Sequence, residues 1–378
     1  RERTFCLIGG DFMPYTVASL FAGIGGIDKG FEQAGAEIIW ANEFDKNACI
    51  TYRANFNHTL IEEDIRKVSE YDMPKADVLT AGWPCVAFSV AGNRHGMKYR
   101  CEVCGHEHSV TFNEYLGGPV CPSCGGYTEA IDPRGTLFFD VIRFIRANEP
   151  KAIFLENVKN LKGHDEGNTF RVVEQMLRES GYFIDSKVMN TMKYGNIPQN
   201  RERIFIAGFR NENALNNFVW PDQVPLTRTI DHILDRKNKQ ESSFYYSDSS
   251  PYYPMLLETM KRKDTVYQLR RVYVRENQSN VCPTLTANMG TGGHNVPLII
   301  DDYGYRKLTP KEALRFQGFP VAEGYVIPEK MANSHIYKQA GNAVSVPVIK
   351  RIAEQLMSAL DTVQTETEEK SQQLKLTI

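Results

Sequence analysis

A single cysteine, Cys85, follows the short apolar run Val78–Ala81 in the stretch Gly82-Trp83-Pro84-Cys85. The rigid proline fixes the direction of the chain and would hold the thiol beyond the end of a strand. Free cysteines are often buried, so an unreactive core thiol is the alternative interpretation. A reactive thiolate needs a lowered pKa, which a nearby cation or helix terminus would provide. Cys85 is therefore a candidate nucleophile that requires partners from other parts of the chain.

Candidate partners for this thiol follow two other apolar runs. Glu156 and Asn157 come directly after Ala152–Leu155, and Arg201 and Arg203 stand just before a further apolar run. A glutamate that donates a proton near pH 7 needs a raised pKa, which a closed pocket would provide. Either arginine could supply the positive charge that favours a thiolate.

The stretch Phe21-Ala22-Gly23-Ile24-Gly25-Gly26 ends a predicted strand and begins a predicted helix. Glycines at such a turn let the backbone approach a ligand at the helix N-terminus. The spacing differs from the dinucleotide-binding fingerprint, so the glycines alone are a weak signal. Glu43, at the end of the next predicted strand, could accept hydrogen bonds from ribose hydroxyls, and Asp64 could accept one from an adenine amino group. The alternative is that both acids are ordinary surface residues.

Four further cysteines form two Cys-x2-Cys pairs, each followed by glycine: Cys101, Cys104, Cys121 and Cys124. This pattern is typical of a zinc ribbon, with zinc the expected metal and iron less favoured. Four thiolates complete a tetrahedron, so His106 and His108 are predicted not to be ligands and the metal to be structural. Two disulfides are disfavoured in a cytosolic protein.

Short apolar runs alternate with amphipathic helical patterns through the first 210 residues, which predicts a doubly wound, mostly parallel sheet. Ligands bind at the carboxyl ends of such strands, and each of the catalytic and cofactor motifs above falls at a strand end. The predicted strands are Val17–Phe21, Glu37–Ala41, Val78–Ala81, Ala152–Leu155, Phe183–Met189 and Ile204–Gly208, and the predicted helices are 26–34, 135–148 and 168–180.

The pattern changes after residue 210, where Tyr, Asn, Ser and Pro become frequent, so a smaller, irregular β-rich domain is expected. We predict a catalytic domain at 1–209 with an inserted ribbon at 98–131, a second domain at 210–334, and a C-terminal segment at 335–378. A short helix should begin at Thr309-Pro310. A last helix from Pro347 should pack its apolar stripe on the first domain, and the polar tail 361–378 is expected to be mobile.

The composition is that of an ordinary globular protein, with 42% hydrophobic and 24% charged residues among 378. No apolar run approaches the ~20 residues that span a bilayer, so no membrane partner and a cytoplasmic location are expected. We also expect a monomer. The net charge of −2 leaves room for one basic face. The candidate face is the cluster at 261–275, although a solvated charged surface would have the same composition.

These motifs together resemble those of bacterial DNA (cytosine-5)-methyltransferases of the restriction–modification type. The resemblance covers residues 17–350 approximately, and it is carried by SLFAGIGGID, ANEFD, GWPCVAFS, RGTLFFD, ENVKN, GNIPQNRERIFIAGF, RKLTPKEALRFQGFP and YKQAGNAVSVPV. It implies a fold of the S-adenosylmethionine-dependent methyltransferase type with a target-recognition domain. It also implies duplex DNA as the partner and a bacterial or phage origin.

In catalytic terms, the resemblance implies a flipped-out cytosine that Cys85 attacks at C6. Glu156 would engage the base at N3 with support from Asn157, and Arg201 and Arg203 would hold the base or its phosphate. Methyl transfer to C5 would be followed by loss of the C5 proton and elimination of the cysteine.

The resemblance also assigns the binding residues. S-adenosylmethionine would contact Phe21, Gly23, Ile24, Gly25, Glu43, Phe44, Asp64, Ile65, Pro84, Leu137, Asn342 and Val344. Two loops within 210–300 would read the DNA major groove, where arginines suit bidentate contacts with guanine. The corresponding residues are Arg270, Arg271, Arg275, Thr284, Thr286 and Asn288.

Two departures from the family pattern stand out. Ser19 replaces an aspartate that is frequent in relatives, and the four-cysteine insertion replaces a short loop after Cys85. The insertion either stiffens this loop or extends a DNA clamp, for which Arg94, Lys98 and Arg100 are the candidate contacts. A tRNA cytosine methylase and a catalytically silent DNA-binding module are the alternative functions.

Overall fold

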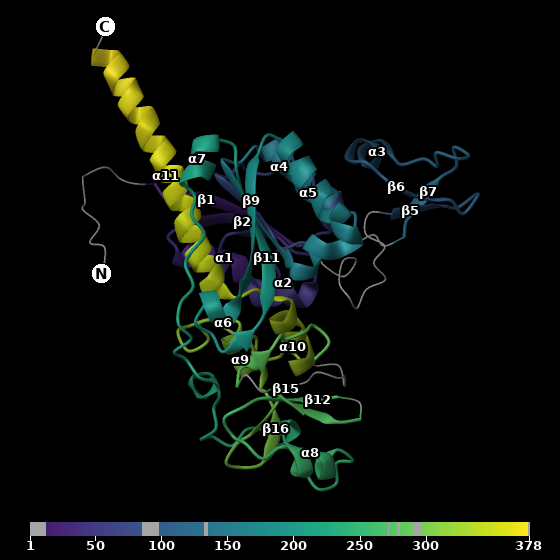
Figure 1. The fold of residues 1–378 in the computed structure, drawn as a ribbon, viewed down its shortest axis with the longest axis vertical. Helices are drawn as coiled ribbons and strands as arrows, with labels where there is room; N and C mark the ends of the chain where they lie inside the picture. The colour runs from purple at the N-terminus through teal and green to yellow at the C-terminus, as the bar shows by residue number, and fades with distance from the viewer. Residues whose placement is uncertain are drawn as a thin grey trace.

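A seven-stranded sheet, in the order β3-β2-β1-β4-β8-β11-β9, forms the centre of the molecule (Figure 1). The computed structural model describes residues 13–84, 98–131, 135–270, 272–277, 280–289 and 297–376, so Cys85, Arg94 and Arg271 lie outside the described residues. The strands are β1 (Thr16–Leu20), β2 (Glu37–Asn42), β3 (Thr59–Ile61), β4 (Val78–Ala81), β8 (Ala152–Val158), β9 (Phe183–Asn190) and β11 (Glu202–Phe209). β11 runs antiparallel to both of its neighbours, and the other pairs are parallel. The predicted mostly parallel sheet is confirmed.

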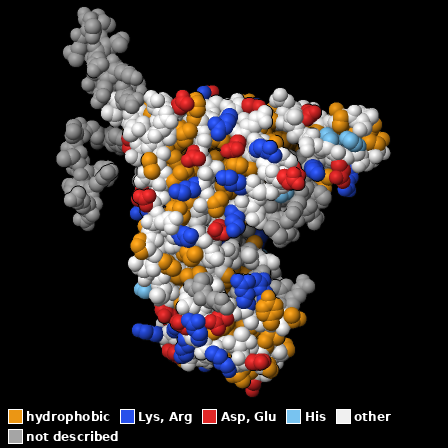
Figure 2. All heavy atoms as spheres, viewed as in Figure 1, with side chains coloured by type: hydrophobic (Ala, Val, Ile, Leu, Met, Phe, Trp, Pro, Cys, Tyr) orange, Lys and Arg blue, Asp and Glu red, His pale blue; other side chains and the backbone are white. Residues whose placement is uncertain are grey.

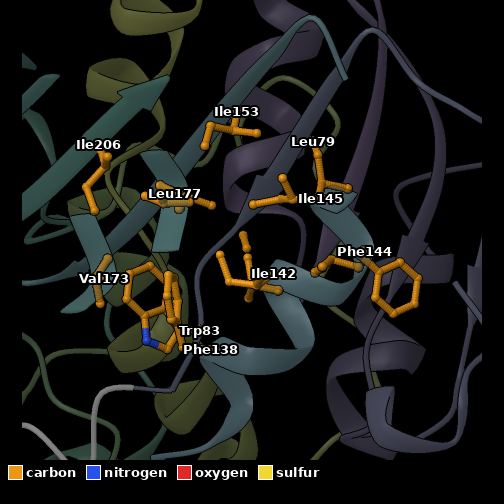
Figure 3. Packing of buried hydrophobic residues seen from close by; sticks show 14 of the residues in the cluster. Leu79, Trp83, Phe138, Ile142, Phe144, Ile145, Ile153, Val173, Leu177 and Ile206 are labelled. Carbon is orange, nitrogen blue, oxygen red and sulfur yellow. The ribbon is translucent and has the colours of Figure 1, made fainter. Parts of the chain in front are cut away.

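Helices cover both faces of this sheet. One face carries α1 (Gly26–Gln33), α7 (Glu212–Asn217) and α11 (Val346–Leu376), and the other carries α4 (Leu137–Asn148) and α5 (Asn168–Glu179). Because successive side chains of a strand point to opposite faces, Phe154 packs in the α1 layer while Ile153 and Leu155 pack in the α4 layer. Figure 3 shows this second layer, where the α4 and α5 side chains meet those of the sheet.

Side-chain caps explain where several helices begin. Asp45 accepts hydrogen bonds from the amides of Asn47 and Ala48 and starts α2 (Lys46–Arg53). Thr309 and Glu312 form a capping box around α9 (Pro310–Phe316), which confirms the helix predicted after Thr309. Short helical turns also occur at η1 (Ile65–Lys67), η3 (Lys159–Gly167), η4 (Ile230–His232), η5 (Ser242–Phe244) and α6 (Thr191–Tyr194).

The cysteine-rich insertion, residues 98–131, forms a small unit at the side of the sheet (Figure 1), which we call the cysteine module. Its strands β5 (Lys98–Cys101), β6 (Glu107–Ser109) and β7 (Thr128–Ala130) pair antiparallel in the order β6-β5-β7. A capped helix, α3 (Phe112–Gly117), connects β6 to the second cysteine pair.

Residues beyond 210 build smaller sheets below the central one (Figure 1), in agreement with the predicted irregular β-rich region. The elements are α8 (Tyr253–Thr259), β12 (Tyr267–Leu269), β13 (Val274–Glu276), β15 (Pro297–Ile300), β16 (Tyr305–Lys307) and α10 (Asn333–Asn342). In addition, β14 (Cys282–Pro283) pairs with β10 (Gln199–Asn200), which joins this region to the strand before β11. The exact domain boundaries stay predictions.

The last helix, α11, packs on the central sheet as predicted. Val348, Ile349, Ile352 and Leu356 lie in the same buried cluster as Phe31 of α1. The helix then continues to Leu376, so the segment expected to be a mobile polar tail is helical over 361–376. Within the described part of the chain, we find no helix with the length and apolar character needed to cross a membrane.

Candidate active site at the carboxyl edge of the sheet

The turn that leads toward Cys85 lies against the Glu156-Asn157 motif. β4 and β8 are neighbours in register, so the chain after Ala81 emerges beside Glu156. A Cβ atom placed on Gly82 would lie 3.6 Å from Glu156 Oε2, and Asn157 Nδ2 donates a hydrogen bond of 3.2 Å to the Trp83 carbonyl. The Trp83 ring packs 5.2 Å from that of Phe138 (Figure 3). Asn157 therefore holds the backbone two residues before Cys85.

Glu156 is buried and paired with one of the predicted arginines. Glu156 is only 8% exposed, and Arg203 Nε lies 3.1 Å from Glu156 Oε1. Burial raises the pKa of Glu156, while the positive charges of Arg203 and Arg201 oppose this shift. The raised pKa is the property that a carboxyl group needs to donate a proton near neutral pH.

Arg201 has different surroundings, although it stands two residues from Arg203. It is 2% exposed, and its guanidinium donates to the carbonyls of Leu285 at 3.0 Å, Gly341 at 3.2 Å and Ala343. These carbonyls belong to the region beyond 210 and to the C-terminal segment. Arg201 thus links two distant segments to the chain between β10 and β11, whereas the structure brings Arg203 to the Glu156 carboxylate.

The glycine turn exposes backbone to one side and is packed on the other. Phe21, Gly23 and Gly25 all have positive φ angles, of 54°, 60° and 79°. A Cβ on Gly25 would lie 2.2 Å from the Phe56 ring, whereas a Cβ on Gly23 would meet nothing within 4 Å. The turn therefore leaves open space beside Gly23, where a ligand can approach the backbone closely.

Glu43 sits beside this open space. Its carboxylate accepts hydrogen bonds from the amides of Gly23 at 2.8 Å, Phe44 at 2.9 Å and Asp45 at 2.8 Å. Burial raises the pKa of Glu43, against the lowering effect of these amides. A carboxylate offers about four acceptor positions, so room remains for a ligand hydroxyl. Phe44 is 65% exposed next to it and presents an apolar ring that a ligand could cover.

The remaining predicted cofactor residues lie at or near the same edge. Asp64 caps η1 and pairs with Arg66, whose hydrogen bonds hold the pKa of Asp64 below its usual range. Ile24 and Ile65 are buried, Pro84 and Leu137 are half-buried, and Asn342 is exposed. Val344 packs against the glycine turn, 2.9 Å from a Cβ placed on Gly26.

The four paired cysteines converge within the cysteine module. Their sulfur atoms all lie within 4.8 Å of one another, and His106 and His108 lie outside this group. Both Gly105 and Gly125 have positive φ and donate their amides to the carbonyls of Cys101 and Cys121. The amides of Cys104 and Val103 point at Cys101 Sγ and lower the pKa of that thiol to about 6. The donor set fits a tetrahedral metal ion bound by thiolates.

The predicted DNA-reading residues fall in two places. Arg270 and Arg275 belong to the β12–β13 hairpin, while Thr284, Thr286 and Asn288 follow β14. Thr284 Oγ1 donates to the Asn200 carbonyl at 2.7 Å, and Thr286 Oγ1 donates to Asn288 Oδ1 at 2.7 Å. A Cβ on Gly341 would lie 2.2 Å from the Thr286 backbone, so this loop is pressed onto α10 next to Arg201.

The predicted groove-reading loop, Gln268–Arg275, includes the tip of the β12–β13 hairpin, but the apolar residues of this tip and a contact behind the glycine turn were not predicted. Val272 and Tyr273, at the tip, are 79% and 52% exposed. Their position between two short β-rich runs was the available signal. Tyr325 donates a hydrogen bond of 2.6 Å to the Ile24 carbonyl, and no sequence signal links residues so far apart.

The basic cluster predicted at 261–275 is partly neutralised. Arg262 pairs with Asp264 at 2.7 Å and Glu276 at 3.1 Å, and Lys263 pairs with Asp302 at 2.9 Å. Figure 2 accordingly shows basic and acidic side chains side by side on the lower part of the molecule. Arg262 and Lys263 therefore fit the alternative interpretation, in which the cluster is a solvated charged surface.

Comparison with known proteins gives matches over nearly the whole chain. A family model described as C-5 cytosine-specific DNA methylase matches residues 15–102 and 117–358, which leaves only part of the cysteine module unmatched inside that span. The Type II methyltransferase M.Bsp6I of Bacillus sp. (strain RFL6) is 50% identical over 346 residues, 91% of this chain and 99% of that protein. The Type II methyltransferase M.SsoII of Shigella sonnei is 35% identical over 354 residues, 92% of this chain and 81% of that protein.

Solved structures share the fold at lower sequence identity. The S. pombe Dnmt2 methyltransferase matches with a TM-score of 0.64 and 17% identity, covering 92% of this chain and 99% of that chain. A putative DNA modification methyltransferase encoded within a prophage of E. coli matches with a TM-score of 0.63 and 20% identity, with the same coverage. These similarities confirm the predicted fold class.

Proposed function

The chain belongs to the C-5 cytosine-specific DNA methylase family, and we propose that it methylates cytosine within a short duplex sequence as a modification enzyme of a Type II system. The observation that carries this proposal is the buried Glu156 carboxyl, which has a raised pKa, contacts Arg203 and lies beside the turn leading to Cys85. The two Type II methyltransferases similar to this chain support the modification role.

In the proposed reaction, the target cytosine leaves the helix and enters the pocket at the sheet edge. The Cys85 thiolate forms a bond to C6 while Glu156 donates a proton to N3, which keeps the ring electrons balanced. Arg203 would hold the base from the side of the Glu156 carboxylate. After C5 gains the methyl group, a base removes the C5 proton, the Cys85–C6 bond breaks with its electron pair returning to sulfur, and N3 gives its proton back to Glu156 as the aromatic ring returns.

S-adenosylmethionine supplies an electrophilic methyl group when it is bound. The open backbone at Gly23, the remaining acceptor position of Glu43 and the exposed Phe44 ring fit the cofactor. Asp64 would accept from the adenine amino group, and Asn342 and Val344 would close the pocket from the C-terminal segment.

In the cysteine module we propose a structural zinc ion, held by Cys101, Cys104, Cys121 and Cys124. Four sulfur ligands leave no open coordination position, so the ion would organise the fold of the module without taking part in the reaction. Arg270, Arg271 and Arg275, together with the loop that carries Thr284, Thr286 and Asn288, would contact the target sequence. Cytoplasmic location and a monomeric state stay predictions.

Bisulfite sequencing of plasmid from cells that express the protein tests this function and identifies the target. The expected result is 5-methylcytosine at one short sequence, absent from cells that express Glu156→Gln. Purified protein should then methylate a duplex that carries this sequence and leave tRNA unmodified. Methylation of tRNA alone, or no methylation by a folded protein that binds S-adenosylmethionine, would contradict the proposal.

A further inference from the structure

The cysteine module is docked on the helix that leads into the site. The Phe112 and Tyr115 rings of α3 lie 6.1 and 5.0 Å from that of Phe139 on α4. The guanidinium of Arg146 stacks 4.5 Å over Phe112, on the same helix face. α3 is therefore an anchored element, and the module rests on α4 through it.

A chain of hydrogen bonds extends from this anchor to the predicted adenine site. The Tyr115 hydroxyl donates to Asp140 Oδ2 at 3.0 Å, and Arg143 Nη2 donates to Asp140 Oδ1 at 3.0 Å. The same guanidinium donates to the carbonyls of Ile65 at 2.7 Å and Val68 at 2.8 Å. Asp140, at the centre of this path, is almost completely buried. It ends at the segment that carries Asp64 and Ile65.

The apolar side of α4 reaches the other half of the site. Phe138 lies beside Trp83, whose carbonyl Asn157 holds (Figure 3). Leu137, at the start of α4, is itself a predicted cofactor contact. A displacement of α4 would consequently disturb both the cofactor edge and the turn before Cys85.

The charge of the cysteine module argues against a DNA clamp. Residues 98–131 contain two basic residues, Lys98 and Arg100, against four glutamates. Arg100 is already paired with Glu107 at 2.6 Å. A surface that neutralises DNA phosphates needs an excess of positive charge. The structure therefore favours a role of the cysteine module in its contacts with α4 over a role as a DNA clamp.

We propose that the metal-bound cysteine module braces the cofactor site, with Tyr115, Asp140 and Arg143 as positioning residues that hold the Asp64–Ile65 segment. This inference rests on the proposed binding of S-adenosylmethionine at that edge. A brace of this kind increases the affinity for the cofactor when the metal is bound. Because coupling between two binding sites is reciprocal, bound cofactor must increase the affinity for the metal by the same factor. Couplings of this kind typically change an affinity by about fivefold or more.

The test uses S-adenosylhomocysteine as the probe and calorimetry as the readout, with zinc content measured on each sample. Tyr115→Phe keeps the ring packed on Phe139 and removes only the hydroxyl that reaches Asp140. Tyr127→Phe is the matched control, because Tyr127 lies in the same module and is 63% exposed. We expect Tyr115→Phe to keep its zinc and to bind the probe about fivefold more weakly, while Tyr127→Phe binds as the unmodified protein does.

A chelator competition supplies the second arm. Saturating S-adenosylhomocysteine should strengthen zinc retention in the unmodified protein, and this effect should shrink in Tyr115→Phe. Unchanged probe affinity in Tyr115→Phe, or zinc retention that ignores the probe, would overturn the brace while leaving the proposed function intact. Failure of the unmodified zinc-loaded protein to bind the probe would instead overturn the proposed function, and the brace with it.

Discussion

The central sheet and the cysteine module bury their apolar residues to very different extents. The sheet is covered on both faces by clusters of fully buried side chains, including Phe138, Phe154 and Leu177. The module leaves Val103 and other large apolar side chains exposed, and two of its four cysteines, Cys104 and Cys124, are exposed as well. A unit this small gains most of its stability from a metal or from docking. We therefore expect the central sheet to fold without the module, whereas the module should depend for its fold on the proposed metal ion and on its contacts with α4.

The largest expected effect belongs to the sheet edge. Glu156→Gln keeps the shape of the side chain but cannot donate a proton to the base. We expect turnover to fall by roughly 10²- to 10⁴-fold, as is typical when a general acid is lost. Zinc content and S-adenosylhomocysteine affinity should not change. Single-turnover methylation with a zinc assay checks this, and normal turnover would exclude Glu156 as the acid.

A structural effect of about 3 kcal/mol is expected at Arg201, because its loss leaves buried carbonyls without donors. Arg201→Met should lower the free energy of unfolding by this amount, since Leu285, Gly341 and Ala343 share this guanidinium. Arg203→Met should reduce turnover strongly, and it should lower the free energy of unfolding less than Arg201→Met does. Urea unfolding and steady-state kinetics on both variants separate the two roles, and equal stability losses would contradict the distinction.

The buried carboxyl of Asp28, in the first turn of α1, predicts a pH dependence within the sheet region. Burial raises its pKa from 3.8 to about 6, although the nearby hydroxyls of Ser19 and Tyr52 lower it. The folded state therefore keeps this proton longer than the unfolded state, and stability is lost as the pH rises from 3.8 to about 6. Relative to Asp28→Asn, the unmodified protein should lose about 3 kcal/mol across that window.

Asp45→Asn is the control of opposite sign for this pH dependence. The pKa of Asp45 is lowered by Lys338 and the α2 amides despite its partial burial, so its ionised form stabilises the folded state. Unfolding free energies measured across both sides of pH 3.8 should show the Asp45 contribution being lost as the pH falls below 3.8, and the Asp28 contribution being lost as the pH rises above it. A constant difference between Asp28→Asn and the unmodified protein would contradict the prediction.

Removing the metal ligands should have the smallest effect on the stability of the central sheet. Cys101→Ser combined with Cys121→Ser should abolish zinc binding and expose the cysteine module to proteolysis. The central sheet should keep its cooperative unfolding transition, because its core makes no use of the sulfur cluster. Limited proteolysis and thermal circular dichroism check this, and global unfolding would show that the two regions are not separate in stability.

Local patterns were enough to predict most of the sheet and the edge where the candidate residues meet. Several apolar runs end at a chemistry-bearing residue such as Glu43 or Glu156, and parallel strands bring such ends together. The reversed direction of β11 was not evident, because a strand pattern carries no orientation. The burial of Arg201 depends on carbonyls 84 to 142 residues away, and the Tyr115–Asp140 bond joins an insertion to the body. Such contacts come from packing of distant segments, which local patterns do not encode.

The attack of Cys85 on C6, assisted by Glu156, is tested most directly with DNA carrying 5-fluorocytosine at the methylated position. Fluorine at C5 blocks the loss of a proton that would release the enzyme, so the covalent adduct should accumulate when S-adenosylmethionine is present. The account predicts a shifted band on a denaturing gel for the unmodified protein and none for Cys85→Ser. An adduct that persists in Cys85→Ser, or no adduct from protein that methylates the ordinary duplex, would contradict it.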